Sequence, residues 1–324
     1  MRIYLREFLS DPRVVEIPRF VWLPILHLFV LRARPKASAA RYARIWTRDG
    51  SPLRLYTERQ ATLLRGYLGE RLRTAIPVEF AMRYGRPTIA EKLSALEEQG
   101  CERIVVVPLY PQYSASTTAS ALDAVYSALA RLRKQPEIRT VRDFHDDSGY
   151  IAALAQSVRD HWMKRGKADL LVMSFHGIPQ RAVDRGDPYE AQCQASARLL
   201  ADQLGLTPEQ YRLAFQSRFG RARWLQPYTA EVLKELGRRK LERVDVICPG
   251  FVTDCLETLE EIAIEGKSIY QAAGGGELQY IPALNDRHEW VGALTSLACR
   301  QLAGWVDLPR APVDPRSRHV GCLP

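Results

Sequence analysis

The stretch ADLLVMSFHGIP at residues 168–179 decides the fold, because it joins a buried strand to residues that can take part in chemistry. Residues 168–175 are almost continuously apolar, which is typical of a strand in a parallel sheet that is covered on both faces. His176 and Gly177 follow at once, so a titratable side chain and a turn end the strand. The sequence therefore predicts an α/β protein with functional residues at the carboxyl edge of a sheet.

Similar runs recur along the chain and extend this prediction. Further strands are predicted at 77–84, 102–110, 137–144, 211–217 and 243–251, whereas residues 88–99 and 149–164 carry apolar residues at helical spacing. Alternating strands and helices favour right-handed βαβ units and a doubly wound fold.

Length and local composition predict two domains. A chain of 324 residues is longer than one core usually serves. The polar, turn-rich segment DFHDDSG at 143–149 marks the boundary, which gives domains at 1–146 and 147–286. Residues 307–324 contain four prolines and three arginines, and we expect them to form a flexible tail.

The composition is that of a globular protein. Hydrophobic residues make up 46% and charged residues 26%, which excludes intrinsically disordered and collagen-like chains. The net charge is +9, but the basic residues are dispersed and form no stripe with aromatic residues, so we expect no nucleic-acid partner. Six scattered cysteines without a C-x-x-C pair, and a start that does not resemble a signal peptide, favour the cytoplasm.

The longest apolar run is FVWLPILHLFVL at 20–31. Its twelve residues are too few to cross a bilayer, which takes about 20. Because Arg19, Arg32, Arg34 and Lys36 flank it, the run suits the surface of an anionic membrane at the inner face of the cell. A helix that packs on its own domain explains the run equally well.

Polar residues follow three of the predicted strands. His176, the segment 218–220 and the segment 253–258 come directly after the strands at 168–175, 211–217 and 243–251. Carboxyl ends of parallel strands meet at one edge of a sheet, so these residues are expected to share a crevice. Histidine titrates near neutral pH and can transfer protons there, although a strand-end histidine bound to a loop is the alternative.

The segment DCLETLEEIAIE at 254–265 is unusually acidic. Asp254 suits a helix N-cap, and Glu257, Glu261 and Glu265 follow at a spacing of four, which predicts three carboxylates on one helical face. Such a row of oxygen ligands suits weak binding of a divalent cation. A solvated acidic face is the alternative, since Glu260 shows that carboxylates also occur elsewhere on the helix.

Other common site motifs are missing from the sequence. It contains neither G-x-G-x-x-G nor G-x-x-x-x-G-K-[ST], so nucleotide binding has no support, and it lacks the G-x-S-x-G elbow of α/β-hydrolases. The cysteines do not have zinc or iron–sulfur spacing.

Several separated motifs occur in a characteristic order. They are YLREFLSDP (4–12), RYG (83–85), YPQYSASTT (110–118), SFHGIP (174–179), RGDPY (185–189), QSRFG (216–220), WL (224–225) and DCLETL (254–259). Together these motifs resemble the ferrochelatase family, whose members insert ferrous iron into a porphyrin. The resemblance runs from Tyr4 to about Leu302.

The resemblance implies a fold and a reaction. It implies two Rossmann-like domains with parallel four-stranded sheets on either side of a porphyrin cleft, and a helix at 287–306 that returns to the first domain. The implied enzyme is a lyase of haem biosynthesis that takes Fe²⁺ and protoporphyrin IX as substrates. A coproporphyrin III ferrochelatase is the alternative within the family, and a non-catalytic tetrapyrrole- or metal-binding protein is the alternative of another class. A monomer is expected, with an oligomer as the alternative.

The resemblance also assigns residues to the site. His176 matches a histidine that takes pyrrole protons or contacts the metal, and Glu257 matches the carboxylate across the macrocycle. Glu261, Glu265 and Asp254 match an acidic row proposed as a metal path or proton exit. The remaining matches bind the substrate: Arg83, Tyr84 and Trp224 along the pocket, and Arg34, Tyr42 and Ser51 at the propionates.

The sequence departs from the family in three places. Cys255 stands where some relatives carry a second histidine. Ala115 replaces a cysteine that holds a [2Fe–2S] cluster in some members, and the tail offers only Cys322, so we expect no such cluster. Relatives begin with a strand and an N-L-G-x-P-like loop that are missing here, so the first sheet is expected to lack its opening strand.

Overall fold

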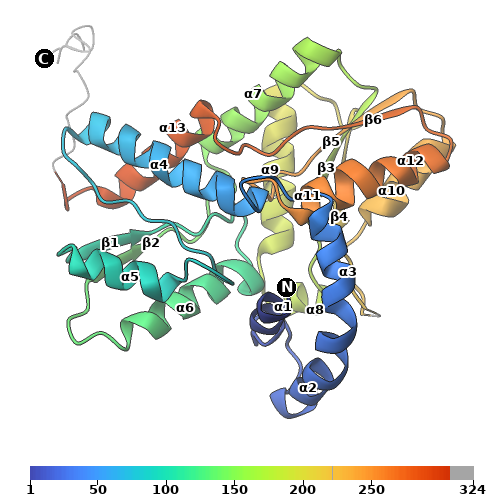
Figure 1. Cartoon of the computed structure of the whole chain (residues 1–324). Helices are drawn as coiled ribbons and strands as arrows, with labels where there is room; N and C mark the ends of the chain where they lie inside the picture. Colours follow the sequence, from blue (N-terminus) through green and yellow to red (C-terminus); the bar gives the residue numbers. More distant parts are fainter. Residues whose placement is uncertain (221, 307–324) are drawn as a thin grey trace, which may run out of the picture.

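The computed structural model describes residues 1–220 and 222–306, which form two parallel sheets covered by helices (Figure 1). The predicted α/β class with parallel sheets is confirmed. The tail expected at 307–324, which includes Cys322, lies outside the described residues. Within those residues, no helix has the length and apolar character that a bilayer crossing requires.

The chain begins with three helices that stand beside the sheets (Figure 1). They are α1 (Arg2–Leu9), α2 (Arg19–Ile25) and α3 (Leu31–Ala43), and the π-helical turn η1 (Leu26–Val30) joins the last two. We call residues 1–43 the N-terminal arm. The arm has a small apolar core of its own, made by Leu5, Leu9, Leu26 and Leu31.

The first sheet contains β1 (Arg103–Val106) and β2 (Glu137–Thr140), paired in parallel with Ile104 opposite Ile138. In Figure 1, α4 (Pro52–Leu72) and α13 (His288–Leu302) lie on one side of this pair. On the other side lie α5 (Ile89–Glu98) and α6 (Ser120–Leu129), which the π-helical turn η2 (Ala115–Ala119) precedes.

The strand predicted at 77–84 is wrong. In the described part of the chain, this segment contains no strand and forms a single ladder bridge, between Met82 and Thr88. The backbone N–H of Met82 donates to the nearby carbonyl of Pro87 at 2.8 Å. Because a strand is defined by a neighbour that pairs along its length, an apolar run without one remains a loop. The first sheet therefore has two described strands where the family resemblance implied four.

The second sheet has the four strands expected, in the order β4–β3–β5–β6. They are β3 (Leu170–His176), β4 (Tyr211–Gln216), β5 (Arg243–Ile247) and β6 (Glu277–Tyr280), all parallel. β6 follows the Gly274–Gly276 loop and was missed by sequence analysis, because only Leu278 of its four residues is fully buried.

Side chains of β3 alternate between two cores. Leu171, Met173 and Phe175 pack with α7 (Ser148–Arg165) and α9 (Tyr189–Leu204) on one face. Leu170 and Val172 pack with α10 (Thr229–Arg238) and α12 (Lys267–Ala272) on the other. Burial on both faces explains the continuous apolar run from which the strand was predicted.

The C-terminal helix connects the two sheets. α13 packs against α4 on the side of the first sheet and against α7 on the side of the second. Its Trp290 is fully buried and stacks on Phe144, with the ring centroids 5.6 Å apart. The helix begins one residue after the predicted start at 287 and ends at Leu302. The division at residues 146 and 147 stays a prediction.

Candidate active site

His176 is the last residue of β3, at the edge where β4 also ends. Its Nδ1 lies 2.6 Å from the carbonyl oxygen of Gly177. A carbonyl only accepts, so Nδ1 carries the proton in this contact and the Nε2 lone pair of the neutral ring is left to act as a base. Gly177 makes the turn possible, because a Cβ there would lie 2.8 Å from the carbonyl oxygen of Gln216.

Two aromatic rings flank the imidazole. The centroids of Trp224 and Phe251 each lie 6.4 Å from that of His176. Trp224 is therefore close to the histidine, and its assignment to the substrate pocket stays a prediction. Phe251 was not singled out in the sequence, although it ends the run RVDVICPGF from which β5 was predicted.

Glu261 is held by the residue that follows β4. The backbone N–H and the hydroxyl of Ser217 each donate to one carboxylate oxygen of Glu261 at 2.6 Å. Burial raises the pKa of Glu261 above its ordinary value, while the hydrogen bonds from Ser217 and the charge of protonated His176 act in the opposite direction. Glu261 and His176 are thus near enough for their charges to interact.

Glu257 lies in α11 (Leu256–Leu259), and its charge acts on two tyrosines of the N-terminal arm. Its backbone carbonyl accepts from Nε2 of Gln216 at 2.7 Å, so β4 anchors this residue as well. Burial and then the charge of Glu257 raise the pKa of Tyr42 to about 12. Burial, Tyr42 and Glu257 together raise the pKa of Tyr4 well above its ordinary value.

The single regular helix predicted for the acidic segment is wrong. α11 ends at Leu259, and the chain continues as the π-helical turn η3 (Glu261–Gly266). Within that turn the N–H of Glu265 donates to the carbonyl of Glu260 at 2.9 Å, five residues back, which widens the helix. Glu265 is 52% exposed and accepts a hydrogen bond from Arg41 at 3.3 Å. Glu265 therefore differs from Glu257 and Glu261 in its exposure to solvent and in its arginine partner.

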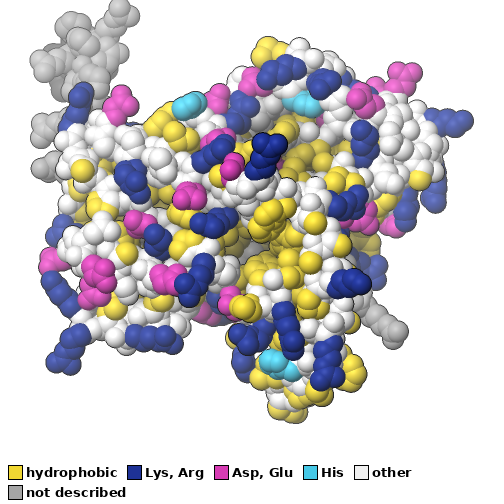
Figure 2. Space-filling model, viewed as in Figure 1, with side chains coloured by type: hydrophobic (Ala, Val, Ile, Leu, Met, Phe, Trp, Pro, Cys, Tyr) yellow, Lys and Arg dark blue, Asp and Glu magenta, His cyan; other side chains and the backbone are white. Residues whose placement is uncertain are grey.

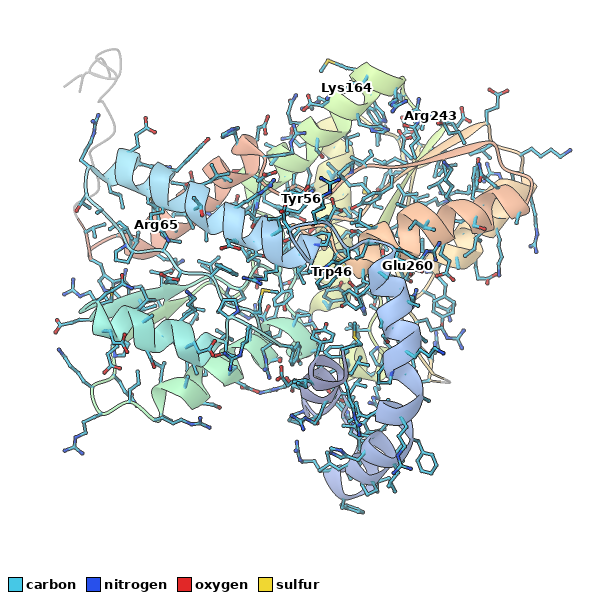
Figure 3. All side chains as sticks on the ribbon, viewed as in Figure 1. Trp46, Tyr56, Arg65, Lys164, Arg243 and Glu260 are labelled. Carbon is cyan, nitrogen blue, oxygen red and sulfur yellow. The ribbon has the colours of Figure 1, made fainter. Side chains whose placement is uncertain are left out.

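Glu260 is the most buried carboxylate of the segment, with 3% of its side chain exposed. It pairs with Arg41 at 2.6 Å and with Arg44 at 2.9 Å, both at the end of α3. Figure 3 shows Glu260 where the arm approaches this segment. The end of α3 is thus held to the acidic segment by ion pairs in which the carboxylate is buried and the two guanidinium groups are half exposed.

Asp254 is buried, and both of its carboxylate oxygens accept hydrogen bonds from the protein. It is 4% exposed, and its Oδ1 accepts from the hydroxyls of Thr258 at 2.9 Å and Tyr280 at 2.6 Å. Its Oδ2 accepts from Nδ2 of Asn285 at 2.7 Å. These bonds connect the start of α11 to the end of β6, so Asp254 is well placed to fix the position of α11.

Arg83 and Tyr84 meet the arm at Asp11. Arg83 forms a short ion pair with this carboxylate, Tyr84 donates to it at 2.9 Å, and Ser120 donates to it at 2.6 Å. Burial opposes the charge of Asp11, but these hydrogen bonds and the guanidinium lower its pKa. The Tyr84 ring also packs edge-on against Phe8 at 5.2 Å and Tyr4 at 6.4 Å. Aromatic packing therefore joins the arm to Tyr84.

The remaining residues implied for propionate binding are spread along the arm and after it. The guanidinium of Arg34 lies 4.0 Å from the ring centroid of Phe219, and burial lowers its pKa. Tyr42 packs edge-on against Trp46 at 6.2 Å. Ser51 is the N-cap residue of α4. Figure 2 shows apolar side chains gathered over the junction between the arm and the rest of the molecule.

Sequence analysis missed Asp11, Ser217 and Arg41 as site components. Asp11 and Ser217 lie inside quoted motifs, but their partners are far away: 109 residues separate Asp11 from Ser120. The signal in the sequence is the pair of arginines at 41 and 44, which lie about one helical turn apart and can share one acidic partner.

A second group of metal-ligand types lies away from this site, in the loop before α7. Among the described residues, the ligand atoms of Asp143, His145 and Asp146 lie within 4.8 Å of one another. Asp143 already accepts hydrogen bonds from Arg142 at 3.0 Å and from Gln192 at 3.2 Å. The guanidinium of Arg142 therefore already compensates part of the negative charge that would attract a metal ion.

Comparisons with known proteins point to one family. Residues 1–302 match the family model described as Ferrochelatase. A curated relative named Ferrochelatase from Aromatoleum aromaticum is 58% identical over 309 residues, which cover 95% of this chain and 85% of the relative. Another with the same name, from Methylibium petroleiphilum, is 59% identical over 305 residues, which cover 94% and 84% of the two chains.

Solved structures show the same fold at low identity. SirB from Bacillus subtilis with Fe³⁺ has a TM-score of 0.57 and 16% identity, with 80% of this chain and 96% of that chain covered. The sirohydrochlorin chelatase SirB from Bacillus subtilis subspecies spizizenii, in complex with cobalt, has a TM-score of 0.54 and 18% identity, with the same coverage. At these identities the likeness concerns the fold alone.

Proposed function

The chain belongs to the ferrochelatase family, and from this membership we infer that it is a protoporphyrin ferrochelatase. It is a lyase of haem biosynthesis that inserts Fe²⁺ into protoporphyrin IX. The reaction releases two pyrrole protons as the ring nitrogens bind the metal, so the site must accept protons and deliver a cation.

We assign the role of base to His176. Its Nδ1 is occupied by the carbonyl of Gly177, so Nε2 is the nitrogen that takes a pyrrole proton. The observation that supports this assignment is the contact of Nδ1 with the Gly177 carbonyl, which leaves Nε2 free at the end of β3. Glu261 is near enough to act electrostatically on this side chain, and a neighbouring carboxylate favours the imidazolium that forms when the proton is taken. Glu257 and Glu261 are the inner carboxylates that receive the metal, and Glu265 is the outer one.

The pocket residues bind the macrocycle in this proposal. Trp224 and Tyr84 contribute apolar ring surface, and Arg83 holds Tyr84 in place, since its guanidinium lies 4.5 Å from the Tyr84 ring centroid. Arg34, Tyr42 and Ser51 offer the cation and hydroxyls that porphyrin carboxylates require. Asp254 positions α11 and with it Glu257.

His176→Ala tests the catalytic assignment. We expect at least a hundredfold loss of iron insertion with porphyrin binding retained, because the base is removed and the cleft is not. His288→Ala is the matched control, since this exposed histidine contacts Tyr67 at 2.6 Å away from the site. Absorbance of the porphyrin reports both binding and metallation. A His176→Ala enzyme with full activity would refute the assignment.

We also propose that the tip of the arm contacts an anionic membrane at the cytoplasmic face. Phe20 is 82% exposed, Phe29 is 67% exposed and Leu28 is 51% exposed, next to Arg19 and Arg32. An apolar patch beside basic residues suits a bilayer surface, which would give an apolar porphyrin a short route to the cleft.

Vesicle binding tests the membrane proposal. Phe20→Ser combined with Phe29→Ser is expected to reduce binding to anionic vesicles at least tenfold, because the inserted apolar area is lost. Tyr126→Ser is the control, since that ring is 51% exposed on α6. Equal binding of the double variant and the wild type would contradict the proposal, as would a wild type that ignores the vesicles at low salt.

A further inference from the structure

Arg41 lies at the outer end of the acidic segment and contacts two of its carboxylates. Its Nε donates to Oε2 of Glu260 at 2.8 Å, and its Nη2 donates to Oε2 of Glu265 at 3.3 Å. The arginine comes from α3 of the arm, 224 residues from Glu265 along the chain. The outermost carboxylate of the proposed metal path therefore has a guanidinium as its neighbour.

Glu260 keeps this guanidinium in place. It is 3% exposed and also binds Arg44 at 2.9 Å, so its charge is compensated from two sides. Removing a partner from a buried carboxylate is unfavourable, which holds Arg41 near the segment even when its contact with Glu265 opens. The hydrogen bond with Glu260 is the main cause that raises the pKa of Arg41, and the charges of Glu265 and Glu261 add to it.

The position of Arg41 has an electrostatic consequence for cations. Glu265 is 52% exposed, so a cation that arrives from solvent along this segment meets it first. A positive charge already bound to Glu265 weakens the attraction of that carboxylate for a second cation. Iron is the substrate of this enzyme and must be released inward, so a carboxylate that retained it would slow the reaction.

We propose that Arg41 is a built-in counter-ion, positioned by Glu260, that keeps Glu265 from retaining divalent cations. The proposal rests on the proposed function, because it treats Glu265 as the outer end of the metal path. Arg41 acts through Glu265 and does not touch the porphyrin, so it is a positioning residue for the metal.

Binding of Mn²⁺ without porphyrin tests this role directly. Arg41→Gln is expected to bind Mn²⁺ about tenfold more tightly than wild type, measured from the electron paramagnetic resonance signal of the free ion. Arg41→Lys keeps the charge and should stay within about twofold of wild type. Arg44→Gln is the matched control, since it also removes a partner of Glu260, and it too should stay within about twofold. The gain should disappear in Arg41→Gln combined with Glu265→Gln.

A second measurement holds even if Arg41→Gln folds poorly. Glu265→Gln alone should change Mn²⁺ affinity by less than about twofold, because Arg41 already compensates the charge of Glu265 in the wild type. Unchanged affinity in folded Arg41→Gln, an equal gain in Arg44→Gln, or a tenfold loss in Glu265→Gln would each overturn the proposal. These titrations need no turnover, so a failure of the His176 assignment is seen separately, in the metallation assay.

Iron kinetics supply a functional readout. Arg41→Gln should lower the KM for Fe²⁺ and lower kcat with it, because iron is retained at Glu265, and Arg41→Lys should restore both. A fall in kcat with unchanged KM would indicate a general structural defect and would count against the proposal.

Discussion

Ser217 holds the carboxylate of Glu261 while its own backbone adopts an unfavourable conformation. Its φ of 64° lies in the left-handed region, which costs of order 1 kcal/mol for a residue with a Cβ. In this conformation its N–H and hydroxyl both reach the carboxylate of Glu261. Strain at this position is compensated by two charge-assisted hydrogen bonds.

Replacing Ser217 is expected to shift the pH profile. Ser217→Ala removes one donor to the ionised form of Glu261, so the pKa of this carboxyl rises further and the acid limb of activity moves up by about one pH unit. Ser217→Gly loses the same hydroxyl but relieves the backbone, so it should show the same shift with higher stability. Profiles that coincide with wild type would show that Glu261 does not control the acid limb.

Glu261 itself should lower the stability of the fold. Its pKa is raised in the folded state by burial, so the folded protein binds a proton that the unfolded chain releases, and stability falls as pH rises above about 4. Glu261→Gln is therefore expected to raise the melting temperature at pH 7 by a few degrees and to have little effect at pH 4. Metallation should fall at the same time. A lower melting temperature at pH 7 would contradict this linkage.

At the scale of elements, Asp11 ties the arm to the start of α6. Asp11→Asn should cost about 3 kcal/mol at pH 7, because Arg83 loses its buried partner. The pKa of Asp11 is lowered in the folded state, so this stabilisation is present above about pH 4 and is lost as pH falls through the folded value. Urea unfolding of Asp11→Asn and wild type, at pH 7 and at a pH well below 4, measures this stabilisation.

Asp123→Asn is the control for the arm. It removes the ion pair with Arg13, in which the side chains are 45% and 47% exposed, and should cost less than about 1 kcal/mol. Equal destabilisation by the two substitutions would show that burial of Asp11 does not matter.

Strands and helices differed in how well the sequence predicted them. β3 was predictable because burial on both faces leaves a continuous apolar run, and its end therefore located His176. Residues 77–84 have a similar run without a pairing partner along their length in the described chain, and pairing is not encoded locally. The π-helical turn η3 was also unpredictable, since the spacing of its glutamates fits a regular helix equally well.

The site shows the same limit. Motifs indicated Glu257 and Glu261 because these residues lie in one conspicuous segment. Their supports are Gln216 at the end of β4 and Ser217 just after it. The partners of Glu260 are Arg41 in α3 and Arg44 at its C-cap. Such contacts depend on the order of strands and the path of the chain, which a single sequence does not give.

At the scale of the molecule, α4 connects the two halves through a buried amide. Gln60 is 1% exposed, and its Nε2 donates to the carbonyl of Asn285 at 2.6 Å. Gln60→Ala should cost about 2 kcal/mol, because that carbonyl is left unpaired in the interior. Arg59→Gln, which removes the exposed pair with Asp286, should cost less than about 1 kcal/mol. Denaturant unfolding compares them, and equal costs would contradict the argument.

The contacts at the end of α3 also determine how late in its synthesis the protein can finish folding. Arg41 and Arg44 leave the ribosome early, but their partner Glu260 follows roughly 200 residues later, which at 5–20 residues per second is about 10–40 s. Throughout that interval the ion pairs that fix the end of α3 cannot form. The start of the chain can therefore join the acidic segment only when translation is nearly finished.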